Sequence, residues 1–191
     1  MSSRICTNPN SILSKPNSND MNKTVLQIIR FVVLVLFQVL VINHIRLGGY
    51  VHPYIYLIFI MLLPFNTPKW QLLVLGFVLG LSIDLFTGTP GLHAGATTLM
   101  AFCRPSIIRL ISGNQKFDNI QELNLGQLDG IWFLRYALFM VLIHHFALFF
   151  LESFSFRLIG QVLLRILLSV PVSIFLIMMI LFIFKREKKK E

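Results

Sequence analysis

The stretch LGFVLGLSIDLFTGTPGLHAGA, residues 75–96, places small residues on both sides of a turn. Gly76, Gly80 and Asp84 are spaced four residues apart, so they share one face of a predicted helix. A Gly-x-x-x-Gly face lets a neighbouring helix backbone approach closely, although such faces are common in membrane helices. Residues 87–91, Thr-Gly-Thr-Pro-Gly, have the composition of a tight turn. The stretch therefore predicts a hairpin of two closely packed helices.

Two polar residues, Asp84 and His93, flank this turn, and Gly95 follows in the small-sided start of the second helix. A carboxylate at membrane depth is costly and usually faces protein or water. We therefore weigh a structural contact of Asp84 inside the bundle against a position at the membrane interface. For His93 the two interpretations are a contact with Asp84 across the turn and a solvated position at the membrane interface.

The composition of the whole chain is that of an integral membrane protein. Of its 191 residues, 55% are hydrophobic and only 13% are charged, about half the usual charged share. A bilayer is the expected solvent for so much apolar surface. The net charge of +9 does not indicate nucleic-acid binding, because the cations gather at the chain ends and in particular loops. Cys6 and Cys103 have no partner at metal-ligand spacing.

Hydropathy predicts an all-α bundle of six transmembrane helices, forming a single domain over residues 24–184. The predicted spans cover residues 25–42, 51–66, 70–86, 92–111, 132–151 and 160–184. Residues 1–23 are predicted to be a disordered polar tail, with Met21 as a candidate natural start. Residues 185–191 are predicted to be a basic cytoplasmic tail.

The second span rests on charge rather than on hydropathy. Its apolar run, residues 54–65, supplies only about 18 Å of helix, so a re-entrant half-helix is the alternative. With six crossings, 14 of the 17 Lys and Arg residues lie on the cytoplasmic side together with both termini. This agrees with the positive-inside rule, which favours six crossings of the bacterial inner membrane.

Arg104 and Pro105 lie near the predicted cytoplasmic end of the fourth span. Arginines in such places commonly snorkel to the headgroups, and the functional interpretation is contact with lipid or with a cytoplasmic partner. Pro105 frees a backbone carbonyl and favours a kink.

Polar residues also flank the start of the last span. Glu152 is a candidate partner for Arg157, which shares a polar stripe with Gln161 and Arg165. Residues 157–165 are expected to form either an interfacial turn or an extension of the sixth span.

No nucleophile–base–acid set, phosphate-binding glycine loop or group of metal ligands is present in the sequence, so we expect no catalysis, cofactor or metal. His144 and His145 point about 100° apart on a helix, which disfavours a shared metal. A solute-binding membrane subunit of a transporter is the alternative function. It predicts a polar, concave pocket that uses Asp84, His93, His144 or Glu152, and it ranks second because few polar groups converge.

Residues 76–105, GFVLGLSIDLFTGTPGLHAGATTLMAFCRP, resemble the central signature of the rod shape-determining protein MreD family. The matching elements are Gly80-Leu81, Asp84-Leu85, the turn Pro90-Gly91-Leu92-His93 and the small residues after it. Residues 38–70 resemble the version of this family found in Bacteroidetes-like bacteria.

The resemblance implies a six-helix fold similar to the substrate-binding subunits of energy-coupling-factor transporters. It implies a non-enzymatic scaffold that supports cell shape and lateral peptidoglycan synthesis by binding the membrane anchor of MreC. Through MreC it would work with MreB, RodA and the transpeptidase of elongation. Candidate residues for helix packing or a partner interface are Gly76, Gly80, Asp84, Pro90, Gly91, His93, Gly95, Arg104 and Pro105.

Overall fold

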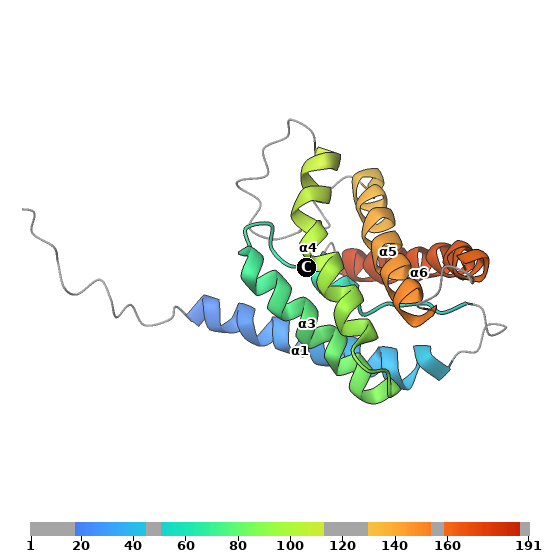
Figure 1. Ribbon diagram of the computed structural model, residues 1–191. Helices are drawn as coiled ribbons and strands as arrows, with labels where there is room; N and C mark the ends of the chain where they lie inside the picture. Colours follow the sequence, from blue (N-terminus) through green and yellow to red (C-terminus); the bar gives the residue numbers. More distant parts are fainter. Residues whose placement is uncertain (1–17, 45–50, 113–129, 154–158, 188–191) are drawn as a thin grey trace, which may run out of the picture.

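The computed structural model describes residues 18–44, 51–112, 130–153 and 159–187, and these ranges are helical with one extended segment (Figure 1). The elements are α1 (Ser18–Leu40), η2 (Ile42–His44), α2 (Ile58–Met61), α3 (Lys69–Thr87), α4 (Leu92–Ser112), α5 (Gly130–Ser153) and α6 (Ile159–Glu187). Residues 1–17 of the predicted tail, the α4–α5 loop, Arg157 and the last residues of the basic tail lie outside the described ranges.

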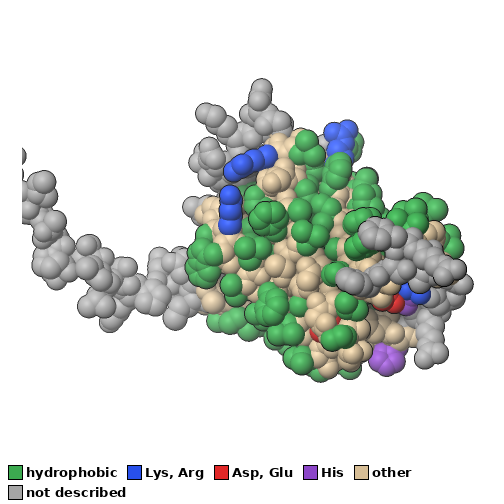
Figure 2. Space-filling model, viewed as in Figure 1, with side chains coloured by type: hydrophobic (Ala, Val, Ile, Leu, Met, Phe, Trp, Pro, Cys, Tyr) green, Lys and Arg blue, Asp and Glu red, His purple; other side chains and the backbone are tan. Residues whose placement is uncertain are grey.

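Four of the described helices are long and apolar enough to cross a membrane: Thr24–His44, Lys69–Thr87, Gly130–Ser153 and Ile159–Ile183. Their outward faces carry large apolar side chains, such as Leu85 at 76% and Phe182 at 67% exposure. Figure 2 shows apolar side chains over much of the visible face, with most of the Lys and Arg at its upper end. Water does not tolerate so much contiguous apolar surface. The chain is therefore a helical membrane protein.

The helices α3, α4, α5 and α6 pack in chain order, each against the next. In Figure 1, α3, α4 and α5 run side by side, and α1 crosses the lower part of this group. We call the two ends of the bundle the Lys69 end, where α3 begins, and the Asp84 end, where α3 finishes. Because neighbouring helices alternate in direction, α4 and α6 begin at the Asp84 end and α5 begins at the Lys69 end.

The structure corrects the predicted second span. Residues 51–66 do not form a transmembrane helix: residues 52–55 have no regular structure, and α2 is only four residues long. Residues 55–61 are at most 2% exposed, so this segment faces protein on every side. It passes between the helices, from the end of α1 to the start of α3 (Figure 1). The described bundle thus has five long helices around one buried segment, residues 52–66. We call it the extended segment for its non-helical start at residues 52–55, although it also contains the short helix α2.

The composition of this segment explains its conformation. Pro53 has no N–H to give to a helix and biases His52 away from helical angles. The apolar run that follows soon turns into the short helix α2, with backbone hydrogen bonds from Ile58 to Ile55 at 3.0 Å and from Met61 to Leu57 at 3.1 Å. An extended residue advances about 3.3 Å, against about 1.5 Å in a helix, so the non-helical residues 52–55 lengthen the reach of this short run. Such backbone is tolerated at membrane depth only where protein surrounds it.

Two boundaries also differ from the prediction. The helix α1 begins at Ser18, so residues 18–23 are helical rather than part of the predicted disordered tail. Ser, Asn and Asp, which open this helix, are favoured at helix starts. The helix α6 begins at Ile159, which makes residues 159–165 an extension of the last span rather than a separate turn.

Candidate functional site

The glycine face of α3 packs directly on the backbone of α4. A Cβ atom added to Gly80 would lie 2.4 Å from the carbonyl oxygen of His93, and one added to Gly76 would lie 2.9 Å from Cβ of Ala101. Real Cβ atoms do not approach so closely, so only glycine permits this helix spacing. The same contact fills the face, and a partner helix could reach Gly76 and Gly80 only by displacing α4.

The carboxylate of Asp84 caps the start of α4. Its Oδ1 accepts the backbone N–H of His93 at 3.0 Å, and its Oδ2 accepts that of Ala94 at 2.9 Å. The Thr89 hydroxyl donates to the same carboxylate, which is only 3% exposed. These amides belong to the first turn of α4 and have no partner within the helix. Asp84 therefore makes a structural contact inside the bundle, and it meets the backbone rather than the imidazole of His93.

The turn between these helices uses left-handed backbone at Gly88 and Gly91, with φ of 69° and 79°. Gly88 ends α3, and its N–H donates to the carbonyl of Asp84 at 2.9 Å. Other residues adopt such angles at a cost, so the two glycines fix the direction in which the chain returns. Pro90 and Gly91 are both exposed at the tip of the turn.

At the Asp84 end, side chains from α1 and α6 hold the extended segment. Gln38 of α1 accepts the N–H of Ile55 at 2.8 Å and donates to the carbonyl of Pro53 at 3.1 Å. The hydroxyls of Ser169 and Ser173 on α6 accept the N–H of His52 at 3.0 Å and of Tyr54 at 3.2 Å. These side chains give hydrogen-bond partners to backbone groups of residues 52–55 that belong to no helix.

At the Lys69 end, Arg104 of α4 holds the other end of the segment. Its guanidinium donates to the carbonyls of Leu63 and Pro64, and its Nε donates to the Tyr136 hydroxyl at 3.0 Å. Tyr136 in turn donates to the carbonyl of Met61 at 3.3 Å. Arg104 is 1% exposed, which corrects the expectation that it snorkels to the headgroups. Pro105 follows it inside a helix that continues to Ser112.

Between these two anchoring points lies a cluster of tyrosines and histidines. The hydroxyl of Tyr56 lies 3.0 Å from Nδ1 of His93 and 2.8 Å from Nε2 of His144, so it joins α4 to α5 through the segment. A tyrosine hydroxyl has one hydrogen, so it donates to one imidazole and accepts from the other. In either arrangement Nδ1 of His144 has no partner within the described residues, although the residue is completely buried.

The Tyr54 ring lies against the rings of three histidines, His93, His144 and His145. Its ring centroid lies 5.3 Å from that of His93, 5.5 Å from His144 and 5.2 Å from His145. Both ring nitrogens of His145 have partners: its Nδ1 donates to the carbonyl of Val141 at 2.9 Å, and its Nε2 lies 3.2 Å from the Ser173 hydroxyl. We call Tyr54, Tyr56, His93, His144 and His145 the His–Tyr cluster. Among the described residues, no group of side chains is arranged to hold a metal.

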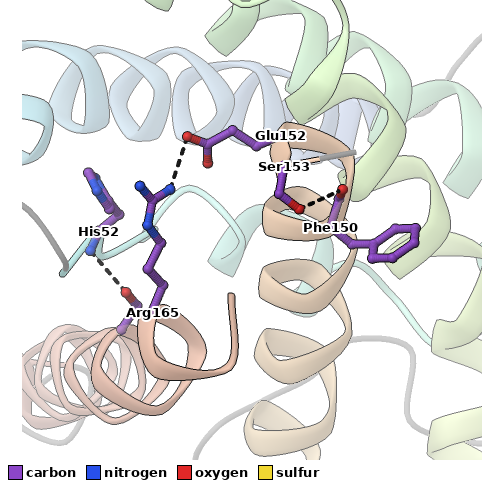
Figure 3. Close-up of polar contacts among 6 residues, drawn as sticks. His52, Phe150, Glu152, Ser153 and Arg165 are labelled. Atoms are coloured by element: carbon purple, nitrogen blue, oxygen red, sulfur yellow. Dashed lines mark hydrogen bonds and ion pairs between the residues drawn. The ribbon is translucent and has the colours of Figure 1, made fainter. Parts of the chain in front are cut away.

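The remaining predicted residues lie apart from this cluster. Glu152 at the end of α5 pairs with Arg165 of α6 at 3.1 Å, on the surface of the Asp84 end (Figure 3). Its predicted partner, Arg157, is outside the described residues. Gly95 is exposed, and with Gly91 it lines a shallow apolar groove between α3 and α4. The wall of this groove includes Phe77 and Phe102.

Sequence reasoning did not single out several residues that hold the segment: Gln38, Tyr54, Tyr56, Tyr136, Ser169 and Ser173. A usable signal was present in α6, where Ser169 and Ser173 are spaced four residues apart in an otherwise apolar span. Polar residues on one face of a membrane helix commonly bond to a neighbour. The spacing does not reveal that the neighbour is bare backbone.

The fold and its interior define a helical membrane protein in which side chains from α1, α4, α5 and α6 converge on one buried, extended segment. No family model, curated protein or solved structure matches this chain.

Proposed function

We propose that the chain is a non-enzymatic scaffold of the bacterial cell-elongation machinery, of the kind that residues 76–105 resemble. The support lies in what those residues do. Asp84 accepts backbone amides of α4, Gly80 admits the α4 backbone, and Gly91 supplies a left-handed turn. Each fixes the position of a helix, and none is left free for chemistry, as is expected of a protein that presents a surface.

The charges favour an orientation with the Lys69 end in the cytoplasm. The exposed cations Lys69, Arg109 and Arg135 lie at this end, whereas Asp84 and Glu152 lie at the other. Gln38 near the end of α1 and Ser169 in the first half of α6 both bind residues 52–55 at the Asp84 end, so α1 begins and α6 finishes toward the Lys69 end. In this orientation we expect both termini in the cytoplasm. The membrane is the bacterial inner membrane, and the terminal lysine run contacts its anionic lipids.

The partner in this proposal is MreC, through which the chain acts with MreB, RodA and the elongation transpeptidase. Since α4 occupies the face of Gly76 and Gly80, the MreC anchor helix is expected in the shallow groove on the outside of the same hairpin. The groove is apolar and contains Gly91, Gly95 and Thr98, whose small side chains permit close helix contact.

Depletion and crosslinking test the two parts of the proposal. Depletion in a rod-shaped host should produce round cells, and normal rods would contradict the cellular role. A photo-crosslinking residue at Phe77 or Phe102 should capture MreC, whereas one at Leu167, which is 69% exposed on α6, should not. Equal capture at all three positions would contradict the groove but not the role.

One observation supports the alternative function, a solute-binding subunit of a transporter. His93 and His144, two of the four residues it invokes, share the hydroxyl of Tyr56. The other two are occupied elsewhere, Asp84 by the amides of α4 and Glu152 by Arg165. We therefore keep the scaffold as the main proposal.

A further inference from the structure

The buried ring of His144 has a hydrogen-bonding atom that the protein does not use. His144 is 0% exposed, its Nε2 meets the Tyr56 hydroxyl, and its Nδ1 has no partner in the described chain. A buried polar atom without a partner costs stability, and such atoms commonly mark a bound molecule or a functional site. By contrast, the hydroxyl of Tyr56 and both ring nitrogens of His145 have hydrogen-bond partners.

The surroundings of this atom select a class of ligand. The His93 and His144 rings are nearly parallel, at 29° and with centroids 6.4 Å apart, and Tyr54 and His145 present their rings to the same histidine. Flat aromatic walls favour a planar group. The charged groups around the cluster are already engaged: Asp84 accepts backbone amides, Glu152 and Arg165 pair with each other, and Arg104 binds Tyr136 at the opposite end. A charged ligand would find no counter-charge here, so an uncharged one is favoured.

The segment that covers the cluster is held in a way that permits movement. Tyr54 is the only member of the His–Tyr cluster that is partly exposed. Its backbone N–H is bound by one serine hydroxyl at 3.2 Å rather than by a helix or a sheet. Moving its ring would uncover His93, His144 and His145 together, because that ring contacts all three.

We propose that the His–Tyr cluster is a binding site for a small uncharged molecule with a planar hydrogen-bonding group, which bonds to Nδ1 of His144. Tyr54 acts as the internal cover that moves aside to admit it. The site is separate from the groove assigned to MreC. A negative binding result would therefore not contradict the scaffold role, and loss of the scaffold role would not contradict the site.

Benzamide is a suitable probe, because it is planar and uncharged and carries both a donor and an acceptor. Toluene has the same ring without hydrogen bonds. The Tm of the purified protein in mild detergent is compared with that of two variants. Tyr54→Ala removes the cover. Tyr54→Ala combined with His144→Phe also replaces the imidazole by a ring without nitrogens. The truncation Phe59→Ala, at a buried apolar position, controls for cavity filling.

In Tyr54→Ala, benzamide should raise the Tm by about 2–4 °C more than toluene does, the shift that about one net hydrogen bond gives a chain of this size. His144→Phe should abolish this difference, and Phe59→Ala should favour toluene. Equal stabilisation by the two probes, or an effect that survives His144→Phe, would show a plain apolar cavity and overturn the proposal.

Histidine labelled with ¹⁵N provides a readout in the unmodified protein, which decides the matter if Tyr54→Ala does not fold. The His144 resonances are assigned by their loss in His144→Phe. Benzamide should move them, and toluene should not. Unmoved His144 resonances at saturating benzamide would overturn the proposal. Normal MreC capture by Tyr54→Ala would show that the scaffold role does not depend on this site, whether or not benzamide binds there.

Discussion

Asp84 in α3 accepts the backbone N–H of Ala94 in α4 at 2.9 Å, so a side chain of one helix caps the next. Replacing Asp84 with Ala should lower the free energy of unfolding by about 1–3 kcal/mol, because two buried amides lose their acceptor. Asp84→Asn keeps one acceptor oxygen and should lose less. Unfolding in mixed detergent micelles, followed by circular dichroism, measures both. Glu152→Gln, at an exposed ion pair, should have little effect, and an equal loss there would argue against capping.

Gly80 and Gly160 offer a matched pair of glycine-to-alanine substitutions. Gly80→Ala places a Cβ 2.4 Å from a backbone oxygen of α4, so the helices must separate, at a cost of about 1–3 kcal/mol. A Cβ added to Gly160, near the start of α6, would meet no described atom within 4 Å, and Gly160→Ala should be neutral or slightly stabilising. The same unfolding assay distinguishes them. A neutral Gly80→Ala would mean that α3 and α4 are not so close.

Two glutamines of α1 separate the role of the extended segment from that of the helix. Gln38→Leu leaves the N–H of Ile55 and the carbonyl of Pro53 buried without partners, which should cost about 2–4 kcal/mol in total. Hydrogen exchange over residues 52–57 should accelerate. In Gln27→Leu the lost oxygen, Oε1, is buried and has no partner among the residues that the structure describes, so stability should be unchanged or raised. Similar behaviour of both variants would contradict the anchoring role of Gln38.

Arg104 and Arg109 lie five residues apart on α4 but should respond differently. Arg104→Met removes the donors to Leu63, Pro64 and Tyr136 and should cost about 3 kcal/mol or more. Arg104→Lys keeps the charge without the planar fork and should recover only part of the loss. Arg109→Met, at an exposed residue, should unfold like the parent protein. Unfolding midpoints and proteolysis near residue 64 report the outcome.

Cysteine labelling tests whether the extended segment crosses the membrane. His52 and Lys69 are both exposed, and they lie at opposite ends of the bundle. In a background with Cys6 and Cys103 replaced, a membrane-impermeant maleimide should label His52→Cys in intact cells. It should label Lys69→Cys only after the cells are opened. Labelling of both in intact cells would show that the segment turns back.

The sequence predicted those features that depend on local periodicity. The spacing of Gly76 and Gly80 indicated close packing, and residues 87–91 indicated the turn that the structure contains. Apolar runs gave the fourth helix, predicted at residues 92–111 and found at Leu92–Ser112. These features follow from neighbours three or four residues apart, which a linear pattern records.

The buried segment could not be predicted in this way. A run such as residues 54–65 has the same hydropathy whether it is a short helix or extended, and charge parity indicates only that the chain crosses. Its conformation depends on Gln38, Ser173 and Arg104, which come from three different helices. Arg104 was misread for the same reason, because its partners are carbonyls forty residues earlier in the chain.

By itself, the sequence determined that this is a helical membrane protein and that residues 87–91 join two packed helices, because hydropathy and glycine spacing act over a few residues. The tertiary structure alone decided that α4 closes the glycine face from within, that Asp84 caps α4, and that a segment with only one short helix occupies the centre. Buried backbone must find hydrogen-bond partners, and which distant side chains provide them is settled only when the helices assemble.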